Sequence, residues 1–566
     1  MCAKVVSGII SDMQIRRIKV QRYRGLNDFT WCPGPGVNCL IGPGDSGKST
    51  VLAAISLLLA PYPAIACSEF DFHRRQVADG FEIEGVITAP PDAVIAGERC
   101  APFVRGWLDG AVTDLPDEGG AEPVLVCRVR GTPDMEAIHE IVLAAGEMPF
   151  SVGLRRKLML SRLSGEERAS RDLRIGSGSV LDRYLGRLDI RPALHQAVAT
   201  ASQQLALPTE VSDSMRGLTE LFGKAGLPDA LHLGLVPAPG TSLSGMVTLM
   251  RGEDPATAIP LAMSGTGTRQ LALLEMSSSL AGENPILVVD EPERGLEPYR
   301  QRAAARRLSD LVGEEGQAFV TTHSPYVLRC MPEDAIWRLR DSSSAIRFEG
   351  THIVKLLRDD PAAFFAPVPV FCEGVTEIGL LDVVLRKVLD GPLDAAGVHL
   401  INGGGQPKVL DMIRAFADAG VPCAGFLDEE NFDPVIRRSL AERCTLFIWN
   451  GAVNVEDAVT RFLPLEHLPR ILEWAEVAKD IQQRHLADQL TAELGGEKTR
   501  DFAELVAVHG EEAVRRSLYS VMSKRRWFKS EVGGAVLARG LIEIDMPAEI
   551  RSQLWDFVKR LKAMLP

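Results

Sequence analysis

Residues 37–50, VNCLIGPGDSGKST, place a short apolar segment directly before a glycine-rich loop. The loop fits the pattern GxxxxGK[ST], in which backbone N–H groups surround the phosphates of a nucleotide. Residues 50–60, TVLAAISLLLA, predict a helix whose positive N-terminal end faces that anion. A strand, this loop and a helix in succession predict a P-loop nucleotide-binding domain of the α/β class.

The loop supplies side chains as well as backbone groups. Lys48 is expected to neutralise the β- and γ-phosphates, and the Ser49 hydroxyl to ligate Mg²⁺. The expected cofactors are therefore ATP and Mg²⁺ (or Mn²⁺). The nucleotide-binding residues predicted in this loop are Gly42, Gly44, Gly47, Lys48, Ser49 and Thr50.

Two later segments carry polar residues at the ends of apolar strands. Residues 286–291, ILVVDE, predict a buried parallel strand followed by Asp290 as a magnesium ligand and Glu291 as the residue that polarises the attacking water. A solvated acidic turn is the alternative for this pair. The strand at 317–321, QAFVT, leads to His323, which either contacts the γ-phosphate or serves as a capping or core histidine.

A further helix start completes the set. Ser264 and Gly265 open the segment SGTGTRQ before the helical stretch LALLEMSSSL, and small residues at a helix N-terminus favour anion binding. Along the chain the four motifs come in the order phosphate loop, SGTGTRQ, VVDEPERGLEP and TTHSP, and in that order they resemble the ABC-type heads of the SMC/RecF class. Residues 15–26, IRRIKVQRYRGL, are also similar to the first strand and turn of that class. The resemblance implies a head-to-head dimer in which Ser264 and Gly265 close on the γ-phosphate held by Lys48 of the other chain. The Q-loop glutamine of that class has no clear counterpart, and Gln76 is the nearest candidate.

Acidic residues recur in the last third of the chain. Glu373, Asp428 and Glu456 each follow an expected strand, and Glu377 lies just after Glu373. If the strands are parallel, their carboxyl ends meet at one edge of the sheet. Carboxylates gathered there repel one another unless a divalent cation is present, so the pattern predicts a metal site, with ordinary surface acids as the alternative.

The pattern EGVTE, GGG and then Asp428-x-Glu430 resembles the Toprim domain. Together with the head it resembles the overcoming-lysogenization-defect (OLD) family, which includes the Gabija nuclease subunit. The resemblance implies metal ligation by Glu373, Glu377, Asp428, Glu430 and Glu456, and a basic residue at Lys529 that stabilises the charged transition state. A glutamate stands at position 430 where many Toprim domains have aspartate, which puts activity or metal preference in question.

Changes along the chain between strand-like and helix-like sequence patterns suggest the domain organisation. We expect an N-terminal part of the ATPase at 1–150, a helical insertion at 151–235 that serves as a dimerisation arm, and the rest of the ATPase at 236–366. The insertion's apolar spacing is seen at Leu194, Val198 and Ala201. After the proline-rich segment before Pro367, residues 367–566 are expected to form the Toprim domain with a small helical C-terminal extension.

Composition narrows the function classes. The chain has 566 residues, 46% of them hydrophobic, and a net charge of −13, which argues against a DNA-coating protein. We find neither a membrane-spanning stretch nor a signal peptide, and the ten cysteines form no CxxC pair. The expectation is a cytoplasmic protein with reduced thiols and no membrane partner.

Two basic clusters are candidates for DNA contact. The first is Arg16, Arg17, Lys19, Arg22 and Arg24, and the second is Arg515, Arg516, Lys524, Arg525, Arg526 and Lys529. In the second, Trp527 and Phe528 are interleaved as expected base-stacking residues, and Arg525, Arg526 and Lys529 are the preferred DNA contacts. Solvated charged faces are the alternative for both clusters.

These observations favour an ATP-regulated, metal-dependent DNA endonuclease or nickase of the OLD class, for which the resemblance implies a role in anti-phage defence and leaves room for an accessory defence protein. The catalytic residues expected are Glu291, His323, Glu373, Asp428 and Lys529. One alternative is a non-cutting SMC/RecF-like repair ATPase whose Toprim domain only binds. Another is the nucleotide-binding subunit of a transporter, which the whole second block disfavours.

Overall fold

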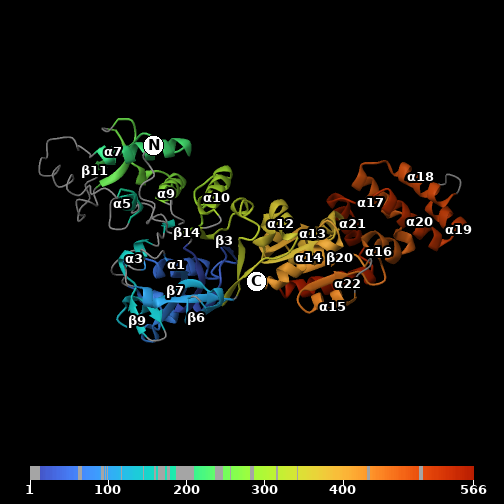
Figure 1. Cartoon of the computed structure of the whole chain (residues 1–566). Coiled ribbons are helices and arrows are strands. Elements are labelled where there is room, and N and C mark those ends of the chain that lie inside the picture. Colours follow the sequence, from blue (N-terminus) through green and yellow to red (C-terminus); the bar gives the residue numbers. More distant parts are fainter. Residues whose placement is uncertain are drawn as a thin grey trace. The chain divides into compact units, whose positions relative to one another are not determined.

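The computed structural model describes residues 13–565 except 61–66, 91–94, 96, 98–99, 117, 144–145, 158–160, 164–172, 175–178, 186–208, 236–246, 255–256, 281–285, 314–315, 341, 430–433 and 496–500. The chain divides into two compact units, Met1–Arg347 and Phe348–Pro566, whose elements are labelled in Figure 1. Leu194, Val198 and Ala201, which suggested the helical insertion, lie outside the described residues.

Unit 1 is built on a sheet that begins with parallel strands, in the order β10 (Ser161–Leu163), β14 (Ile286–Asp290), β15 (Gln317–Thr321), β3 (Gly36–Ile41) and β16 (Ile336–Arg340). Strands β14, β15 and β3 are buried almost throughout, as expected for parallel strands that are covered on both faces. The predicted strands at 37–41, 286–290 and 317–321 are thereby confirmed.

The same sheet continues into a largely antiparallel part. Beyond β16 the order is β17, β2, β1, β4, β7, β5 and β6. Strand β8 also pairs with β7, and β9 pairs with β8. Their bounds are β17 Ser344–Arg347, β2 Leu26–Trp31, β1 Ile15–Tyr23, β4 Phe81–Thr88, β7 Glu122–Gly131, β5 Val104–Leu108, β6 Ala111–Thr113, β8 Ala137–Leu143 and β9 Gly146–Pro149. On β1 and β4 apolar residues alternate with polar ones, so one face packs against α1 (Lys48–Leu58).

Helices and a small second sheet complete unit 1. Its other helices are α3 (Val152–Lys157), α5 (Val180–Leu185), α7 (Thr209–Lys224), α9 (Thr266–Leu280), α10 (Pro298–Val312) and α11 (Pro325–Leu328). Strands β11 (Leu231–Leu235), β12 (Val247–Arg251) and β13 (Ile259–Pro260) pair antiparallel. The stretch at 151–235 thus contains strands β10 and β11 as well as helices, and β10 belongs to the main sheet because it pairs with β14.

Unit 2 contains a four-stranded parallel sheet in the order β19 (Val398–Asn402), β18 (Val368–Cys372), β20 (Ala424–Leu427) and β21 (Thr445–Ile448). Helix α13 (Val375–Leu389) packs on the Val370 face of β18, whereas Phe371 faces Phe416 of α14 (Gln406–Asp418). The strands expected before Glu373, Asp428 and Glu456 are confirmed as β18, β20 and β21, and the carboxyl ends of all four strands lie at one edge.

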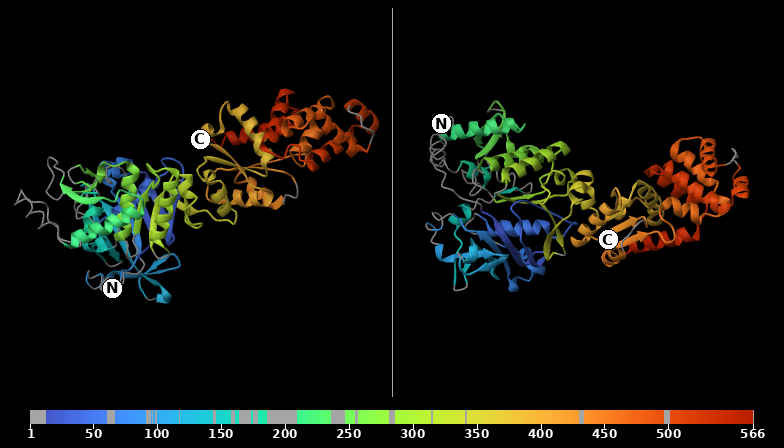
Figure 2. Two further views of the ribbon diagram at one scale, coloured as in Figure 1. Left: turned by 90° about the horizontal axis from the view of Figure 1, so that it is seen from above. Right: turned by 45° about the vertical axis from the view of Figure 1, so that its right-hand side comes forward.

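Most remaining helices of unit 2 form a bundle (Figure 2). Their bounds are α12 Ile353–Asp359, α15 Pro434–Ala441, α16 Val455–Phe462, α17 Arg470–Lys479, α18 Gln483–Leu494, α19 Phe502–His509, α20 Glu511–Lys524, α21 Glu531–Glu543 and α22 Ala548–Lys562. Helix α21 crosses α13 closely, because a Cβ atom at Gly379 would lie 1.9 Å from the Glu531 carbonyl oxygen. Contacts at this distance admit only glycine.

Residues 348–366 fold with the second unit. Phe348 and Phe364 pack edge to face, and both lie tilted against Phe416 of α14, with ring centroids 5.1 to 5.3 Å apart. In the described part of the chain, no helix has the length and apolar character needed to cross a membrane. The nine cysteines in that part are free thiols.

Candidate nucleotide and metal sites

The glycine-rich loop wraps around its own lysine. Gly47 precedes α1 with φ +97°, a conformation that glycine adopts without strain. The Lys48 Nζ atom donates to the carbonyl oxygens of Gly42 at 3.0 Å and Pro43 at 2.7 Å. Burial lowers the pKa of Lys48, while the carboxylates of Asp290 and Glu291 act in the opposite direction. The ammonium thus lies inside the loop, where a phosphate group would contact it.

Asp290 joins this loop to the end of strand β14. Its Oδ1 atom accepts hydrogen bonds from the Ser49 hydroxyl at 3.2 Å and from the Thr321 hydroxyl at 2.5 Å. The register of β14 and β15 places Asp290 opposite Thr321. The expected pair of Ser49 and Asp290 therefore lies together, which is the pairing that a magnesium ion beside a nucleotide requires. Thr321 was not predicted, although it is the last residue of an expected strand.

Glu291 and His323 lie at the ends of neighbouring strands. Glu291 has φ +52°, and its N–H donates to the Thr321 carbonyl oxygen at 3.1 Å. Its Oε1 atom is 4.0 Å from Nε2 of His323, and both side chains are roughly half exposed. A strained non-glycine backbone is common where a side chain must be aimed at a reacting group. The geometry allows both residues to face one bound phosphate.

A second glutamate in the same turn was missed by sequence reasoning. Glu293 accepts from the His323 N–H at 2.7 Å through Oε1 and from the Thr322 hydroxyl at 2.9 Å through Oε2. Burial raises the pKa of this carboxyl, against the effect of these hydrogen bonds. Glu293 thereby fixes the backbone that carries His323. The only signal in the sequence was its place in the segment DEPE.

Ser264 and Gly265 stand at the N-terminal end of a helix, as expected. They precede α9, and Gly267 in its first turn packs so tightly on the Gly295 turn that a Cβ atom would lie 2.3 Å from the Gly295 oxygen. Within the described residues, no hydrogen bond or ion pair joins Ser264 or Gly265 to Lys48, Ser49 or Asp290. Closure of these residues on a nucleotide of another chain stays a prediction. Gln76, the Q-loop candidate, is exposed at the end of a 3-10 turn.

The predicted acidic site is assembled at the carboxyl edge of the sheet in unit 2. Glu373 follows β18, Asp428 follows β20, and Glu377 and Glu456 lie in the first turns of α13 and α16. Glu373 Oε2 accepts from the Asp428 N–H at 3.1 Å. Glu377 and Glu456 are 2% and 1% exposed, which is unusual for carboxylates without a full set of partners. The four side chains form one cluster of negative charge.

Burial and mutual repulsion raise the pKa of two of these carboxyl groups, Asp428 and Glu377. Burial, followed by the charges of Glu377 and Glu373, raises the pKa of Asp428 to about 8. Burial also raises the pKa of Glu377, with Glu456 and Glu373 adding to the shift and Lys529 opposing it. Repulsion between like charges in a partly buried site has this effect. The cluster is therefore a place where positive charge is favoured.

Lys529 supplies one such charge from far along the chain. Its Nζ atom lies 3.1 Å from Glu456 Oε1 and 3.3 Å from Oε2. Burial lowers the pKa of Lys529, but Glu456 and Glu377 outweigh that effect and the net shift is upward. The lysine is held there because Thr376 of α13 donates to the Phe528 carbonyl oxygen at 3.0 Å and α21 begins at once after Ser530. The glycine contact between α13 and α21 thus determines its position.

The described carboxylates of the acidic cluster are the kind of ligand that a divalent cation binds, but their side chains do not converge on one point. Carboxylate oxygens are the ligands that Mg²⁺ and Mn²⁺ prefer. Asp428 Oδ1 is buried and has no hydrogen-bond partner among the described residues. Glu456 Oε1 also lacks a hydrogen bond, but its ion pair with Lys529 partly satisfies it. Among the residues that the structure describes, no three His, Cys, Asp or Glu side chains converge closely enough to hold a metal ion. Glu430 lies outside the described residues.

Asp457, next to Glu456, forms hydrogen bonds that cap the start of α16. Its Oδ2 accepts from the Val453 N–H at 2.9 Å, and its own N–H donates to the Asn454 side chain at 3.0 Å. These bonds cap the start of α16 and orient Glu456 toward the cluster. Of the two adjacent acidic residues, Asp457 therefore caps the helix, whereas Glu456 belongs to the acidic cluster.

Part of the predicted DNA-contact surface is corrected by the structure. Trp527 and Phe528 are 1% and 0% exposed and belong to the core of unit 2, so they cannot stack on bases. Their apolar side chains pack between the helices instead, and Trp527 Nε1 donates to Gln489 at 3.0 Å. Arg525 and Arg526 are exposed and make no side-chain hydrogen bond or ion pair within the described residues.

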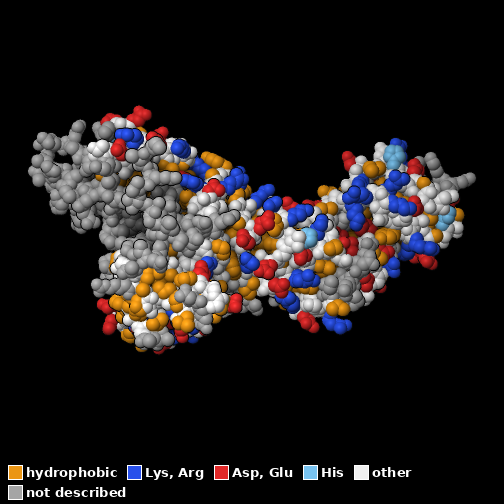
Figure 3. Space-filling view, viewed as in Figure 1, with side chains coloured by type: hydrophobic (Ala, Val, Ile, Leu, Met, Phe, Trp, Pro, Cys, Tyr) orange, Lys and Arg blue, Asp and Glu red, His pale blue; other side chains and the backbone are white. Residues whose placement is uncertain are grey.

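The other basic residues are mostly paired. Arg516 and Lys524 lie 3.7 and 2.6 Å from Glu512 and Glu493. Arg515 donates to the backbone oxygens of Thr460, in the last turn of α16, and of Leu463, just after it. In the first cluster, ion pairs of 2.6 to 3.0 Å join Arg16 to Glu122, Arg17 to Glu84 and Arg24 to Asp71. Figure 3 accordingly shows Lys and Arg side chains interspersed with Asp and Glu on the visible face of unit 2.

Comparison with protein families identifies both parts of the chain. Residues 153–329 match the family described as "AAA domain, putative AbiEii toxin, Type IV TA system", and residues 364–429 match "Overcoming lysogenization defect protein-like, TOPRIM domain". The first match includes Ser264, Asp290 and His323, and the second includes Glu373 and Asp428. The chain therefore carries an AAA-type ATPase domain followed by an OLD-like Toprim domain, which confirms the expected pairing. The ATPase match implies nucleotide binding, and Toprim domains typically bind divalent metals.

Individual proteins add shorter or weaker likenesses. Protein ea59 of Escherichia phage lambda is 40% identical over 68 residues, which is 12% of this chain and 13% of the phage protein. An Smc head bound to the C-terminal winged-helix domain of ScpA shares 15% identity with TM-score 0.38 and covers 60% of this chain and 99% of its own. An Smc head from Pyrococcus furiosus shares 13% identity with TM-score 0.34, and the match covers 59% of this chain and 96% of the Smc chain. RecF bound to an ATP analogue shares 12% identity with TM-score 0.32, and the match covers 61% of this chain and 100% of the RecF chain.

Proposed function

We propose that this protein is an ATP-regulated, divalent-metal-dependent DNA endonuclease or nickase of the OLD class. The observation that carries the proposal is the gathering of Glu373, Glu377, Asp428 and Glu456 around Lys529 at the carboxyl edge of a parallel sheet. The ATPase and OLD-like Toprim domains support it. An anti-phage role and a cytoplasmic location are part of the proposal; the OLD-like match supports the first, and the scattered cysteines of the sequence support the second.

In this proposal the four carboxylates hold Mg²⁺ or Mn²⁺, which would supply an activated water and stabilise the leaving oxygen of a phosphodiester. Glu373 and Asp428 lie closest to the sheet edge and would position the cation, with Glu430 as a further proposed ligand. Lys529 would exchange part of its contact with Glu456 for the developing charge on the phosphate. Arg525, Arg526 and Lys529 would bind the DNA backbone.

The ATPase unit would gate this reaction. Lys48, Ser49 and Asp290 would hold ATP and its Mg²⁺, Glu291 would polarise the attacking water, and His323 would contact the γ-phosphate. We propose a homo-oligomer in which Ser264 and Gly265 of one chain approach the nucleotide of another, with residues 151–235 as a dimerisation arm. Because β10 in this stretch belongs to the main sheet, the test uses the full chain: sedimentation across a concentration series, with and without ATP, should show an oligomer, and a monomer under every condition would count against the proposal.

Plasmid cleavage with Mg²⁺ or Mn²⁺, with and without ATP, tests the proposal directly. We expect the wild type to cut or nick, Glu373→Ala to lose cutting while retaining ATP hydrolysis, and Lys48→Ala to reveal whether ATP activates or inhibits. Intact plasmid under every condition, together with ATP hydrolysis, would contradict the nuclease proposal. It would instead favour a non-cutting repair ATPase, for which the incomplete convergence of the carboxylates is the supporting observation.

A further inference from the structure

Strand β21 leaves one side of its backbone open. It is the last strand in the order β19-β18-β20-β21 among the described residues. The Thr445 N–H donates to the Cys423 carbonyl oxygen at 3.2 Å, so Thr445 and Phe447 turn their backbone groups toward β20. Because these directions alternate along a strand, Leu446, Ile448 and Asn450 turn their N–H and C=O groups away from the sheet.

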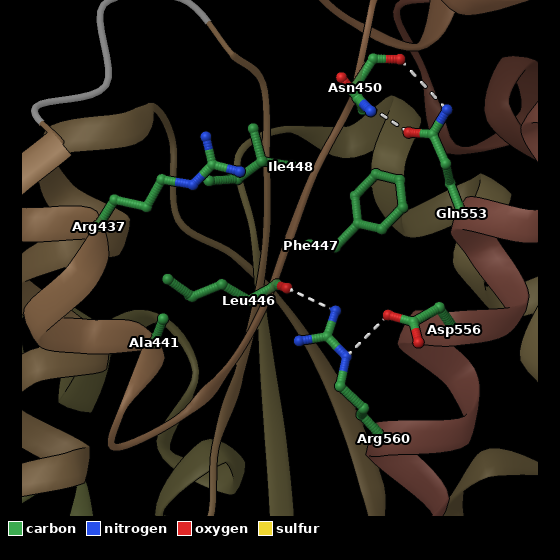
Figure 4. A pocket seen from close by; sticks show the side chains of 9 residues that line it. All are labelled: Arg437, Ala441, Leu446, Phe447, Ile448, Asn450, Gln553, Asp556 and Arg560. Atoms are coloured by element: carbon green, nitrogen blue, oxygen red, sulfur yellow. Dashed lines mark hydrogen bonds and ion pairs between the residues drawn. The ribbon is translucent and has the colours of Figure 1, made fainter.

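Helix α22 covers the two ends of this open edge (Figure 4). Gln553 accepts from the Asn450 N–H at 2.7 Å and donates to the Asn450 carbonyl oxygen at 3.3 Å, as the backbone of a neighbouring strand would. Arg560 Nη2 donates to the Leu446 carbonyl oxygen at 3.0 Å. Ile448 lies between them, and within the described residues neither its N–H nor its C=O makes a hydrogen bond.

The open residue faces a cavity of about 280 Å³ between α15 and α22. Arg437 and Ala441 line it from α15, and Gln553, Asp556 and Arg560 line it from α22 (Figure 4). Arg560 is paired with Asp556 at 3.1 Å, whereas Arg437 has no ion pair within the described part of the chain. Among the residues that the structure describes, the cavity thus combines a positive charge without an ion pair with a backbone donor and acceptor that have no hydrogen bond.

We propose that this groove docks an extended, acidic segment of a partner protein, which adds to β21 as a further strand. A peptide residue both accepts from the Ile448 N–H and donates to its carbonyl oxygen, whereas a nucleic-acid phosphate can only accept. An aspartate or glutamate on the added segment would pair with Arg437. Proteins usually blunt exposed strand edges, and here the flanking side chains leave one residue accessible. The inference does not depend on the nuclease proposal.

Selection from a library of random peptides displayed on phage, against the full chain, tests the inference. Selected peptides are expected to be β-prone with one recurrent acidic residue. Synthetic copies should bind Arg437→Glu about tenfold or more weakly, a loss of about 1.4 kcal/mol or more. Ile448→Pro removes the open N–H without touching the ladder to β20 and should also weaken binding. Arg438→Glu, an exposed change on the same helix outside the cavity, is the matched control and should bind as the wild type does.

Amide hydrogen exchange locates the bound peptide. In the full chain, a saturating selected peptide should slow exchange in the segment that contains Leu446 and Ile448. Three results would overturn the proposal: no peptide whose binding depends on Arg437, a selected peptide that leaves exchange at β21 unchanged, or a short DNA duplex that protects this segment instead. Dimerisation of the chain that Ile448→Pro abolishes would likewise overturn it, since the occupant would then be a second copy.

Discussion

The nucleotide site of unit 1 and the acidic site of unit 2 both gather carboxylates at the ends of parallel strands, but they satisfy them differently. Asp290 accepts two hydroxyl hydrogen bonds, and Glu293 accepts a backbone N–H and a hydroxyl. Within the described residues one Asp428 oxygen has no hydrogen-bond partner, and burial together with its carboxylate neighbours raises its pKa. The first site is ordered by hydrogen bonds within the chain, whereas the second retains a charge imbalance that a cation would relieve.

The largest expected effects come from breaking each site separately. Lys48→Ala should lower ATP hydrolysis, and Glu373→Ala should lower metal-dependent DNA cleavage, each by roughly 10² to 10³-fold because each removes a group proposed to bind charge at the reaction centre. Steady-state ATP hydrolysis and plasmid nicking measure the two losses. Glu429→Ala, an exposed acid beside Asp428, is the control and should change neither rate. A Glu373→Ala chain that still nicks DNA at the wild-type rate would place the chemistry elsewhere.

The repulsion among the carboxylates of unit 2 should lower the thermal stability of the protein, so it can be measured by thermal unfolding. Asp428→Asn removes one of the repelling carboxylates, so without metal it should raise the melting temperature by roughly 5 °C. The folded-state pKa of Asp428 is about 8, above its ordinary value of 3.8, so the wild type loses stability as pH rises through this interval. The difference between variant and wild type should therefore grow from about pH 4 to about pH 8 and then level off.

Added Mg²⁺ or Mn²⁺ sharpens the same measurement. The cation should raise the melting temperature of the wild type and have little effect on Asp428→Asn, because ligand binding stabilises only the state that binds it. Equal stabilisation of both chains by metal would show that Asp428 is not a ligand.

A smaller effect is expected from disturbing the ordered site. Glu293→Gln replaces an acceptor with an amide that cannot accept both the His323 N–H and the Thr322 hydroxyl hydrogen, which should cost about 1 to 3 kcal/mol of stability in urea unfolding. The turnover number for ATP should fall while its KM changes little, because Glu293 positions His323 without touching the nucleotide. The matched control is Glu297→Gln, since Glu297 is exposed and makes only a long ion pair of 3.6 Å with Arg300. An unchanged turnover number would remove Glu293 from the positioning of His323.

The smallest effect concerns DNA binding outside both sites. Arg525→Ala and Arg526→Ala should each weaken DNA binding and reduce the slope of log affinity against log salt by about one, if each arginine contacts a phosphate. Fluorescence anisotropy across a salt series measures the slope. Arg516→Ala, whose side chain is paired with Glu512, should leave the slope unchanged.

Sequence patterns predicted the elements well because each depends on neighbouring residues. The apolar run at 286–289 is β14, the segment after Lys48 is α1, and residues 317–321 are β15. Buried parallel strands need continuous apolar side chains, and phosphate loops need glycine at fixed spacing, so both leave local signals. The surroundings of Trp527 left no such signal, because an aromatic residue beside arginines is equally compatible with a helix core and with a base-stacking surface.

What the sequence alone determined, then, is the strand, loop and helix of the nucleotide site and the positions of Asp290 in unit 1 and of Glu373 and Asp428 in unit 2 at the carboxyl ends of their strands, since these follow from short motifs. Strands β10 and β11, in the stretch expected to be helical, left no such motif. Only the tertiary structure decided that Lys529 pairs with Glu456, because that contact depends on the glycine crossing of α13 and α21. It likewise decided that Glu293 holds His323, and that Ile448 keeps an open backbone edge. The physical reason is that these contacts join residues distant in the chain, and their geometry is fixed by packing rather than by the identity of adjacent residues.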